Sequence, residues 1–128
     1  EYFRKLESGI VKELSEKDNL IISTGGGLVL KRENNELLQK NGKIVFLRAS
    51  LETLVGRLRV YDDRPLLKAE AGGIAQRLSE LLKERAPVYE HVADFIVDVD
   101  GKSADENARE VISVVREYLR KTNEAGTK

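Results

Sequence analysis

Three consecutive glycines follow a short apolar segment of the chain. Leu20-Ile21-Ile22-Ser23 has the composition of a strand, and Thr24 then leads into Gly25, Gly26 and Gly27. Glycines permit φ > 0 and let a ligand approach the backbone closely, and in open α/β sheets ligands bind outside the carboxyl ends of strands. The triplet is therefore either a ligand-binding turn or merely a flexible one, and by itself it favours neither.

An arginine and a glutamate lie three residues apart before this segment. A helix predicted over residues 2–14 places Glu7 inside its apolar arc, where a charge is costly unless it is paired. Arg4 can reach Glu7 from an adjacent face, and such a pair can orient a guanidinium toward a carboxylate or a polyol. A surface ion pair is the simpler interpretation. The apolar residues at helical spacing are Phe3, Leu6, Ile10 and Leu14.

Two further arginines stand near prolines. Arg64 precedes Pro65 in a stretch over about residues 60–75 whose composition suits a mobile lid, and on a lid it can clamp phosphoryl oxygens after closure. Arg85 ends a helix predicted over residues 74–86 and limited by Pro87. The planar fork of Arg85 suits bidentate binding of a carboxylate. A solvated arginine is the simpler interpretation of each.

Other charged residues are weaker candidates. Arg57 and Arg59 lie near the end of a predicted helix, where either can stack on a base, although most arginines at helix ends do not. Asp62 and Asp63 are adjacent acidic residues, and a solvated pair in a loop is the simpler interpretation than a metal site.

Strands alternate with helices along the chain, and this order predicts an α/β fold with a parallel sheet covered on both faces. Ser50 has the character of an N-cap, and Ser103 to Glu106 form an S-x-x-E capping box. Strands are expected over residues 20–23, over 43–48 as an apolar run buried on both faces, and from Phe95. Helices are expected over residues 2–14, 33–40, from 51, over 74–86 and over 103–120.

Composition limits the classes of function. The 128 residues predict one domain, and the 22 basic and 22 acidic residues cancel, which argues against nucleic-acid or membrane partners. There is no cysteine, so disulfides, thiolate metal sites and cysteine nucleophiles are excluded. No apolar run approaches the roughly 18 residues that cross a bilayer. We expect a cytoplasmic, monomeric enzyme.

In their order and spacing, these motifs resemble the shikimate kinase family. The matching segments are E-Y-F-R-K-L-E, I-I-S-T-G-G-G, I-V-F-L-R-A-S, R-P-L-L and K-E-R-A-P-V-Y-x-x-V-A-D, from Glu1 to about Val99. The resemblance implies a three-layer, P-loop kinase-like fold that spans residues 1–128, with a lid around 60–75. It also implies transfer of the γ-phosphoryl group of ATP to the 3-hydroxyl of shikimate, with Mg²⁺, in aromatic amino acid biosynthesis.

The same resemblance assigns roles to the shikimate side of the site. Arg4 and Arg85 would hold the shikimate carboxylate, and Glu7 would position Arg4. The backbone N–H groups of Gly25, Gly26 and Gly27 would face the hydroxyls of the ring.

Three residues are assigned to the ATP side in the same way. Arg64 would be the lid arginine that touches the ATP phosphates, and Arg57 would lie beside the adenine. Lys102 falls where the family has a loop that contacts the adenine.

The chain departs from the family pattern in one respect. The Walker A motif, G-x-x-x-x-G-K-[ST], is absent from the sequence. We therefore expect the ligands of Mg²⁺ and the Asp used on the shikimate hydroxyls in a segment that precedes Glu1. Without the first strands and the P-loop, the sheet would lack the strand that the family places between its third and fourth, and the flanking backbone groups would be unpaired.

Two classes of function follow from this departure. The chain is either the C-terminal portion of an enzyme that phosphorylates shikimate, inactive alone, or a catalytically inactive kinase-like module that binds a small acid or a protein partner. A kinase of another hydroxylated metabolite, such as gluconate, is disfavoured because the arginines suit a carboxylate.

Overall fold

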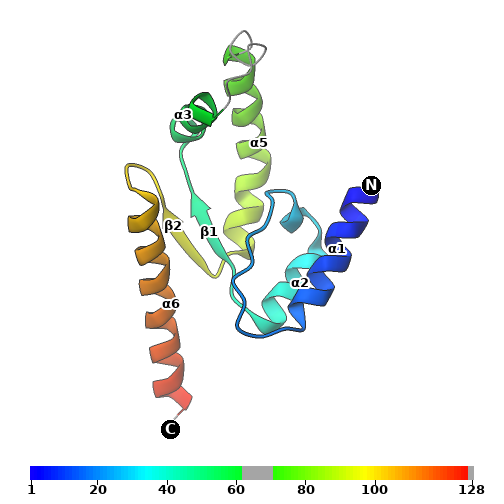
Figure 1. Ribbon diagram of the computed structural model, residues 1–128, viewed down its shortest axis with the longest axis vertical. Helices are drawn as coiled ribbons and strands as arrows, with labels where there is room; N and C mark the ends of the chain where they lie inside the picture. Colours follow the sequence, from blue (N-terminus) through cyan, green and yellow to red (C-terminus); the bar gives the residue numbers. More distant parts are fainter. Residues whose placement is uncertain (62–70, 127–128) are drawn as a thin grey trace.

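The computed structural model describes residues 1–61 and 71–126. The strands of the described chain lie at the centre, with helices around them and the two termini far apart (Figure 1). The elements in chain order are α1 (Tyr2–Ser15), the 3₁₀ helix η1 (Leu28–Leu30), α2 (Arg32–Asn41), β1 (Val45–Arg48), α3 (Leu51–Tyr61), α5 (Ala71–Val92), β2 (Phe95–Asp98) and α6 (Ala104–Gly126).

The strands β1 and β2 pair in parallel, in a register that sets Val45 opposite Phe95. Side chains alternate between the faces of a sheet, and aromatic contacts identify what covers each face. Phe95 meets Tyr118 of α6 with ring centroids 5.5 Å apart, and Phe46 meets Tyr89 of α5 at 5.0 Å. Because Phe46 and Phe95 point to opposite faces, α5 and α6 lie on opposite sides. The predicted parallel α/β arrangement is confirmed.

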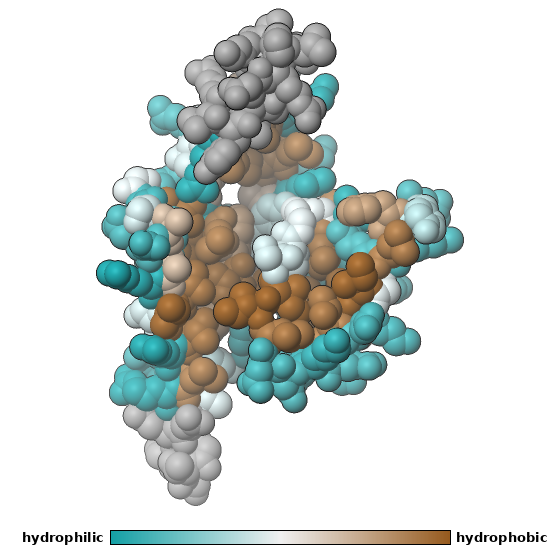
Figure 2. All heavy atoms as spheres, in the orientation of Figure 1, coloured by the Kyte–Doolittle hydropathy of each residue, from teal (hydrophilic) through white to brown (hydrophobic). Residues whose placement is uncertain are grey.

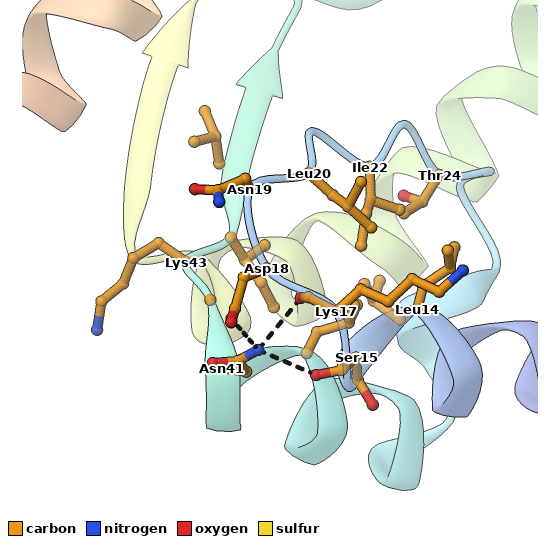
Figure 3. A pocket seen from close by; sticks show the side chains of 15 residues that line it. Leu14, Ser15, Lys17, Asp18, Asn19, Leu20, Ile22, Thr24, Asn41 and Lys43 are labelled. Atoms are coloured by element: carbon orange, nitrogen blue, oxygen red, sulfur yellow. Dashed lines mark hydrogen bonds between the residues drawn. The ribbon is translucent and has the colours of Figure 1, made fainter.

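The predicted strand over residues 20–23 is not part of this sheet. The segment has no regular secondary structure, because no strand within the described residues lies beside it to exchange backbone hydrogen bonds. Ile21 is fully exposed. Figure 3 shows Leu20 and Ile22 on this segment, and Thr24 just after it, at the wall of a pocket of about 220 Å³ that also reaches the start of β1.

Local signals at several helix ends are confirmed. The Ser50 hydroxyl accepts a hydrogen bond from the Thr53 amide at 3.2 Å, which caps α3. At the start of α6 the Glu106 amide donates to Ser103 Oγ at 3.1 Å, and the Ser103 amide donates to Glu106 at 3.2 Å, as a capping box requires. Asn19 has φ of 60° and turns the chain after α1.

The predicted end of a helix at Pro87 is wrong, because α5 continues through Pro87 to Val92. A proline inside a helix removes a hydrogen bond and costs about 3 kcal/mol or more. The turns that follow it contribute Val92 to the main apolar cluster, and Val88 and Tyr89 pack against that cluster. This burial offsets the cost of the proline and keeps the last turns helical.

Burial is concentrated where α1, η1, α2 and the end of α5 meet. The cluster there consists of Val11, Leu28, Val29 and Val92. The inward stripe of α1 includes Glu7, Val11 and Leu14 but not Phe3, Leu6 and Ile10, which are exposed, so the predicted apolar face of this helix is only partly correct.

The sheet is less covered than the sequence predicts. Val97 is buried, but Leu47 of β1 is 55% exposed, so the apolar run is not buried on both faces. On the face drawn in Figure 2, apolar side chains gather across the middle of the molecule. The large exposed apolar residues of the described chain include Leu20, Ile21, Ile22, Leu47 and Ile96.

Candidate functional site

The glycine triplet forms a tight turn between the extended segment and η1. The Leu28 amide donates to the Gly25 carbonyl at 3.4 Å, and Gly27 is buried. None of the three glycines has positive φ, so left-handed backbone is not why glycine is needed here. The reason lies in the side chains that approach the turn from two other helices.

Arg4 approaches Gly27 from α1. A Cβ atom built on Gly27 would overlap the Arg4 guanidinium, at 2.8 Å from Cζ. Arg4 Nη1 also donates to Glu7 Oε1 at 2.8 Å, and the Glu7 side chain is only 11% exposed. Glu7 therefore fixes the guanidinium against the bare backbone of the turn, and the pair predicted from the sequence is confirmed as a contact.

Arg85 and Tyr89 approach Gly26 from α5. The Tyr89 hydroxyl donates to the Gly26 carbonyl at 2.7 Å. A Cβ atom on Gly26 would lie 2.9 Å from that hydroxyl and 3.3 Å from Arg85 Nη1. Two guanidinium groups from helices far apart in sequence thus flank two adjacent glycines. Such a site offers paired cations for an anionic group and backbone amides for hydroxyls.

Two asparagines hold the chain immediately after the glycines. Asn34 Nδ2 donates to the Leu28 carbonyl at 2.9 Å, and Asn35 Nδ2 donates to the Val29 carbonyl at 2.7 Å. Both side chains are buried, and the Oδ1 atom of each has no partner. Buried polar atoms without partners are costly, so these amides are placed here to fix η1 and not merely to fill space.

A second recess lies beside Arg57 at the carboxyl end of β1. Its volume is about 570 Å³, and Asn107 and Val99 also line it. A neighbouring recess of about 230 Å³ is lined by Arg85 and Tyr89. The two recesses share a wall, which consists of Leu47, Ala49 and Leu54. The Arg57 side and the glycine-turn side are therefore adjacent.

Charged residues near the strand ends are engaged in structural contacts. Arg48 forms a bidentate pair with Asp98 at 2.6 and 2.9 Å, and its hydrogen bonds lower the pKa of the Asp98 carboxyl. Asp100 accepts a hydrogen bond from the Ser50 amide at 3.0 Å, which lowers its pKa. Lys102 Nζ bonds the Asp98 carbonyl at 3.0 Å and Glu110 at 2.6 Å, and its pKa is raised by Glu110.

Several sequence-based predictions reach beyond the described structure. Arg64 and residues 62–70 of the predicted lid lie outside the described residues, whereas positions 60–61 and 71–75 belong to α3 and α5. Within residues 1–61 and 71–126 no cluster of His, Asp or Glu is arranged to hold a metal ion. No helix in the same ranges is long and apolar enough to cross a membrane.

Comparison with known proteins decides the family. The family model for shikimate kinase matches residues 1–116. The chain belongs to the shikimate kinase family. The shikimate kinase of Caldanaerobacter subterraneus subsp. tengcongensis is 43% identical over 120 residues, which are 94% of this chain and 67% of that protein. The shikimate kinase of Thermodesulfovibrio yellowstonii is 40% identical over 121 residues, 94% of this chain and 66% of that protein.

Solved shikimate kinases share the fold. The shikimate kinase from Acinetobacter baumannii in complex with shikimate has a TM-score of 0.76 and 30% identity, over 91% of this chain and 64% of that one. The enzyme from Bacteroides thetaiotaomicron has a TM-score of 0.75 and 32% identity, over 92% and 68% respectively. The chain thus spans about two thirds of the length of the shikimate kinases that it matches.

Sequence reasoning missed three residues of the site. Tyr89, Asn34 and Asn35 were given no role in the site from the sequence. The spacing of Tyr89 four residues after Arg85 was an available signal, because residues at i and i+4 share a helix face. Adjacent asparagines inside a helix were a second signal, since asparagine is a poor helix former unless its side chain has a specific partner.

Proposed function

We propose that this chain binds shikimate at the glycine turn and forms the acid-binding half of an ATP-dependent kinase. The observation that carries the proposal is the convergence of Arg4 and Arg85 on Gly26 and Gly27. A carboxylate that lies between two guanidinium groups is bound by charge-assisted hydrogen bonds, which are stronger than neutral ones. Membership of the shikimate kinase family supports the choice of this acid.

The backbone of the turn supplies the polar contacts for the hydroxyls of the substrate. The amides of Gly26 and Gly27 have no hydrogen-bond partner among the described residues, so they are available as donors. Glu7 keeps Arg4 in place through their 2.8 Å contact. In this arrangement Arg4, Glu7, the glycines and Arg85 bind and orient shikimate, and the 3-hydroxyl is the group that receives the phosphoryl.

The recess beside Arg57 is the proposed site of the adenine. Its volume of about 570 Å³ lies within the range of ligand pockets, and its apolar wall suits a flat base on which an arginine can stack. Lys102, whose ammonium is paired with Glu110, borders this region in the loop after β2. Arg64 is proposed for the ATP phosphates, where it would add positive charge and, on a closed lid, help to exclude water.

Transfer of the phosphoryl group also needs elements that the sequence lacks. No Walker A motif occurs, and the described residues form no set fitted to Mg²⁺, which neutralises phosphate charge when it is bound. About a third of each matched relative lies outside the match, and the uncovered apolar residues beside β1 favour a further segment there. We therefore propose that these 128 residues bind shikimate but do not turn it over alone. A cytoplasmic monomer stays a prediction.

Titration calorimetry with shikimate and with its methyl ester tests the acid site. Shikimate should bind and the ester should not, because the ester has no charge for the guanidinium groups. The control variant Arg77→Ala should keep this difference between the acid and the ester. Arg77 is exposed on the same helix as Arg85 but is not part of the proposed site. Equal binding of acid and ester would overturn the proposed site.

An assay with ATP, Mg²⁺ and shikimate tests the second part. We expect no turnover above background from the chain alone, and turnover near that of a complete family member would sink this part of the proposal. The chain can also be assayed together with the part of a related shikimate kinase that lies outside the match. If shikimate binds but this mixture also gives no turnover, the inactive binding module becomes the better description.

A further inference from the structure

Tyr89 makes the contact that ties the glycine turn to α5. Its hydroxyl donates to the Gly26 carbonyl at 2.7 Å, and its ring rests on Phe46 of β1 with centroids 5.0 Å apart. The ring is therefore held from the sheet side while the hydroxyl holds the turn. Neither the family assignment nor the proposed arginine contacts requires a role for this hydroxyl.

The bond acts on one particular peptide group. The Gly26 carbonyl and the Gly27 N–H belong to the same peptide, and no peptide bond among the described residues is cis. In a trans peptide the carbonyl and the N–H point in opposite directions. A hydroxyl that fixes the direction of the Gly26 carbonyl therefore also fixes the direction of the Gly27 N–H.

A peptide between two glycines especially needs such a restraint. Without Cβ atoms, rotation about the bonds that flank it meets little steric resistance, so the peptide can flip over. A flipped peptide would present a carbonyl oxygen where the N–H had been. For a ligand that offers an electronegative oxygen, this replaces an attraction by a repulsion.

The contacts of the neighbouring segments do not restrain the Gly26–Gly27 peptide itself. After the glycines the chain is fixed by Asn34 and Asn35, which hold the Leu28 and Val29 carbonyls. Before them, residues 19–24 make no backbone hydrogen bond within the described chain. The Gly26–Gly27 peptide lies at the boundary between a fixed and a loosely held segment, and within the described residues Tyr89 makes the only hydrogen bond to the Gly26 carbonyl.

We propose that Tyr89 is a positioning residue that locks the Gly26–Gly27 peptide with the Gly27 N–H available to an oxygen of the substrate. The identity of that substrate rests on the proposed function, but the lock itself belongs to the unliganded chain. Because Tyr89 lies one helical turn after Arg85 on α5, the same helix sets both the cation for the carboxylate and the direction of the amide.

Nuclear magnetic resonance on the unliganded chain tests the lock without any ligand. Tyr89→Phe deletes the hydroxyl and keeps the ring, and Tyr118→Phe is the matched control, because Tyr118 packs on Phe95 far from the turn. In Tyr89→Phe the Gly26 and Gly27 amides should show exchange broadening on the microsecond-to-millisecond timescale. The same amides should stay sharp in the parent chain and in Tyr118→Phe, and a sharp Gly27 amide in folded Tyr89→Phe would overturn the lock.

Titration with shikimate tests the link to the ligand. We expect the Kd of Tyr89→Phe to rise about tenfold, the loss of roughly one well-placed hydrogen bond, with the Kd of Tyr118→Phe unchanged. Each variant is measured well below its Tm, so a change in stability alone does not alter the result. Broadening with an unchanged Kd would overturn the assignment of the Gly27 N–H to the ligand. If the parent chain binds no shikimate, the proposed function fails, while the resonance data still decide the lock.

Discussion

The glycine turn and the sheet are stabilised in different ways. The turn is held by side chains from three helices, namely Arg4 of α1, the two asparagines of α2 and Tyr89 of α5. Within residues 1–61 and 71–126 the sheet has two strands, on which Leu47 and Ile96 are exposed. The described chain thus supplies the contacts that shape the turn but does not cover the whole sheet. Acid binding should therefore be testable in this chain, whereas the proposed nucleotide site needs residues that the described chain does not supply.

Replacing one arginine of the proposed acid site and one of the proposed nucleotide site by alanine should have the largest effect. Arg85→Ala removes a guanidinium proposed to hold the carboxylate, and shikimate Kd should rise about a hundredfold, since charged hydrogen bonds contribute roughly 1.5–3 kcal/mol. Arg57→Ala, on the proposed nucleotide side, should change the shikimate Kd less than about twofold. Calorimetry with shikimate separates the two variants, and a larger loss in Arg57→Ala than in Arg85→Ala would overturn the assignment of Arg85.

Filling the turn with a single methyl group should have the next largest effect. In Gly27→Ala the new Cβ overlaps the Arg4 guanidinium, at 2.8 Å from Cζ, so Arg4 must move away from the turn. We expect shikimate Kd to rise about tenfold, the equivalent of ~1.4 kcal/mol.

Gly25→Ala is the matched control for that substitution. A Cβ atom at Gly25 meets nothing within 4 Å, so binding should be unchanged. If both alanine variants bind alike, close approach is not the reason for glycine at Gly27.

The turn also depends on the buried amide of Asn34, which is 1% exposed. In Asn34→Ala the Leu28 carbonyl loses its hydrogen bond of 2.9 Å and keeps only the one from the Lys31 amide at 3.5 Å, so the free energy of unfolding should fall by about 1–3 kcal/mol. Glu36→Ala on the same helix is the control, because its ion pair with Arg32 is exposed and contributes at most about 1 kcal/mol. Urea unfolding measures both, and equal losses would show that the amide is not special.

Much of the fold could be predicted because its signals are local. Ser50 and Ser103 cap helices through residues three positions away, and the alternation of strands and helices gave the parallel arrangement. The prediction of a strand over residues 20–23 failed because a strand forms only beside another strand, and composition does not reveal whether one is there. The prediction that the helix ends at Pro87 failed for a related reason. The burial of Val92 that keeps α5 helical is a tertiary effect.

The candidate site could be predicted in part for the same reasons. Arg4 and Glu7 are three residues apart, and their contact follows from helical geometry. The bond from Tyr89 to Gly26 joins residues 63 positions apart, and no pattern of spacing predicts such a contact. The glycines were expected to permit φ > 0 and the close approach of a ligand, whereas at Gly26 and Gly27 the missing Cβ atom leaves room for Tyr89 and Arg4.

The smallest effect should come from the sheet, through acid pH. The hydrogen bonds from Arg48 hold the pKa of Asp98 below its ordinary value of 3.8. The unfolded chain therefore takes up this proton first as the pH falls. The stabilisation is present above pH 3.8 and is lost as the pH drops through the lower pKa of the folded state. Both side chains are exposed, so the change should be slight. Asp98→Asn should flatten the loss of stability as the pH falls below 3.8 in urea unfolding, whereas Glu13→Gln, at an exposed position of α1, should not. A parent-like slope in Asp98→Asn would mean that the Arg48–Asp98 pair does not contribute to holding β1 against β2.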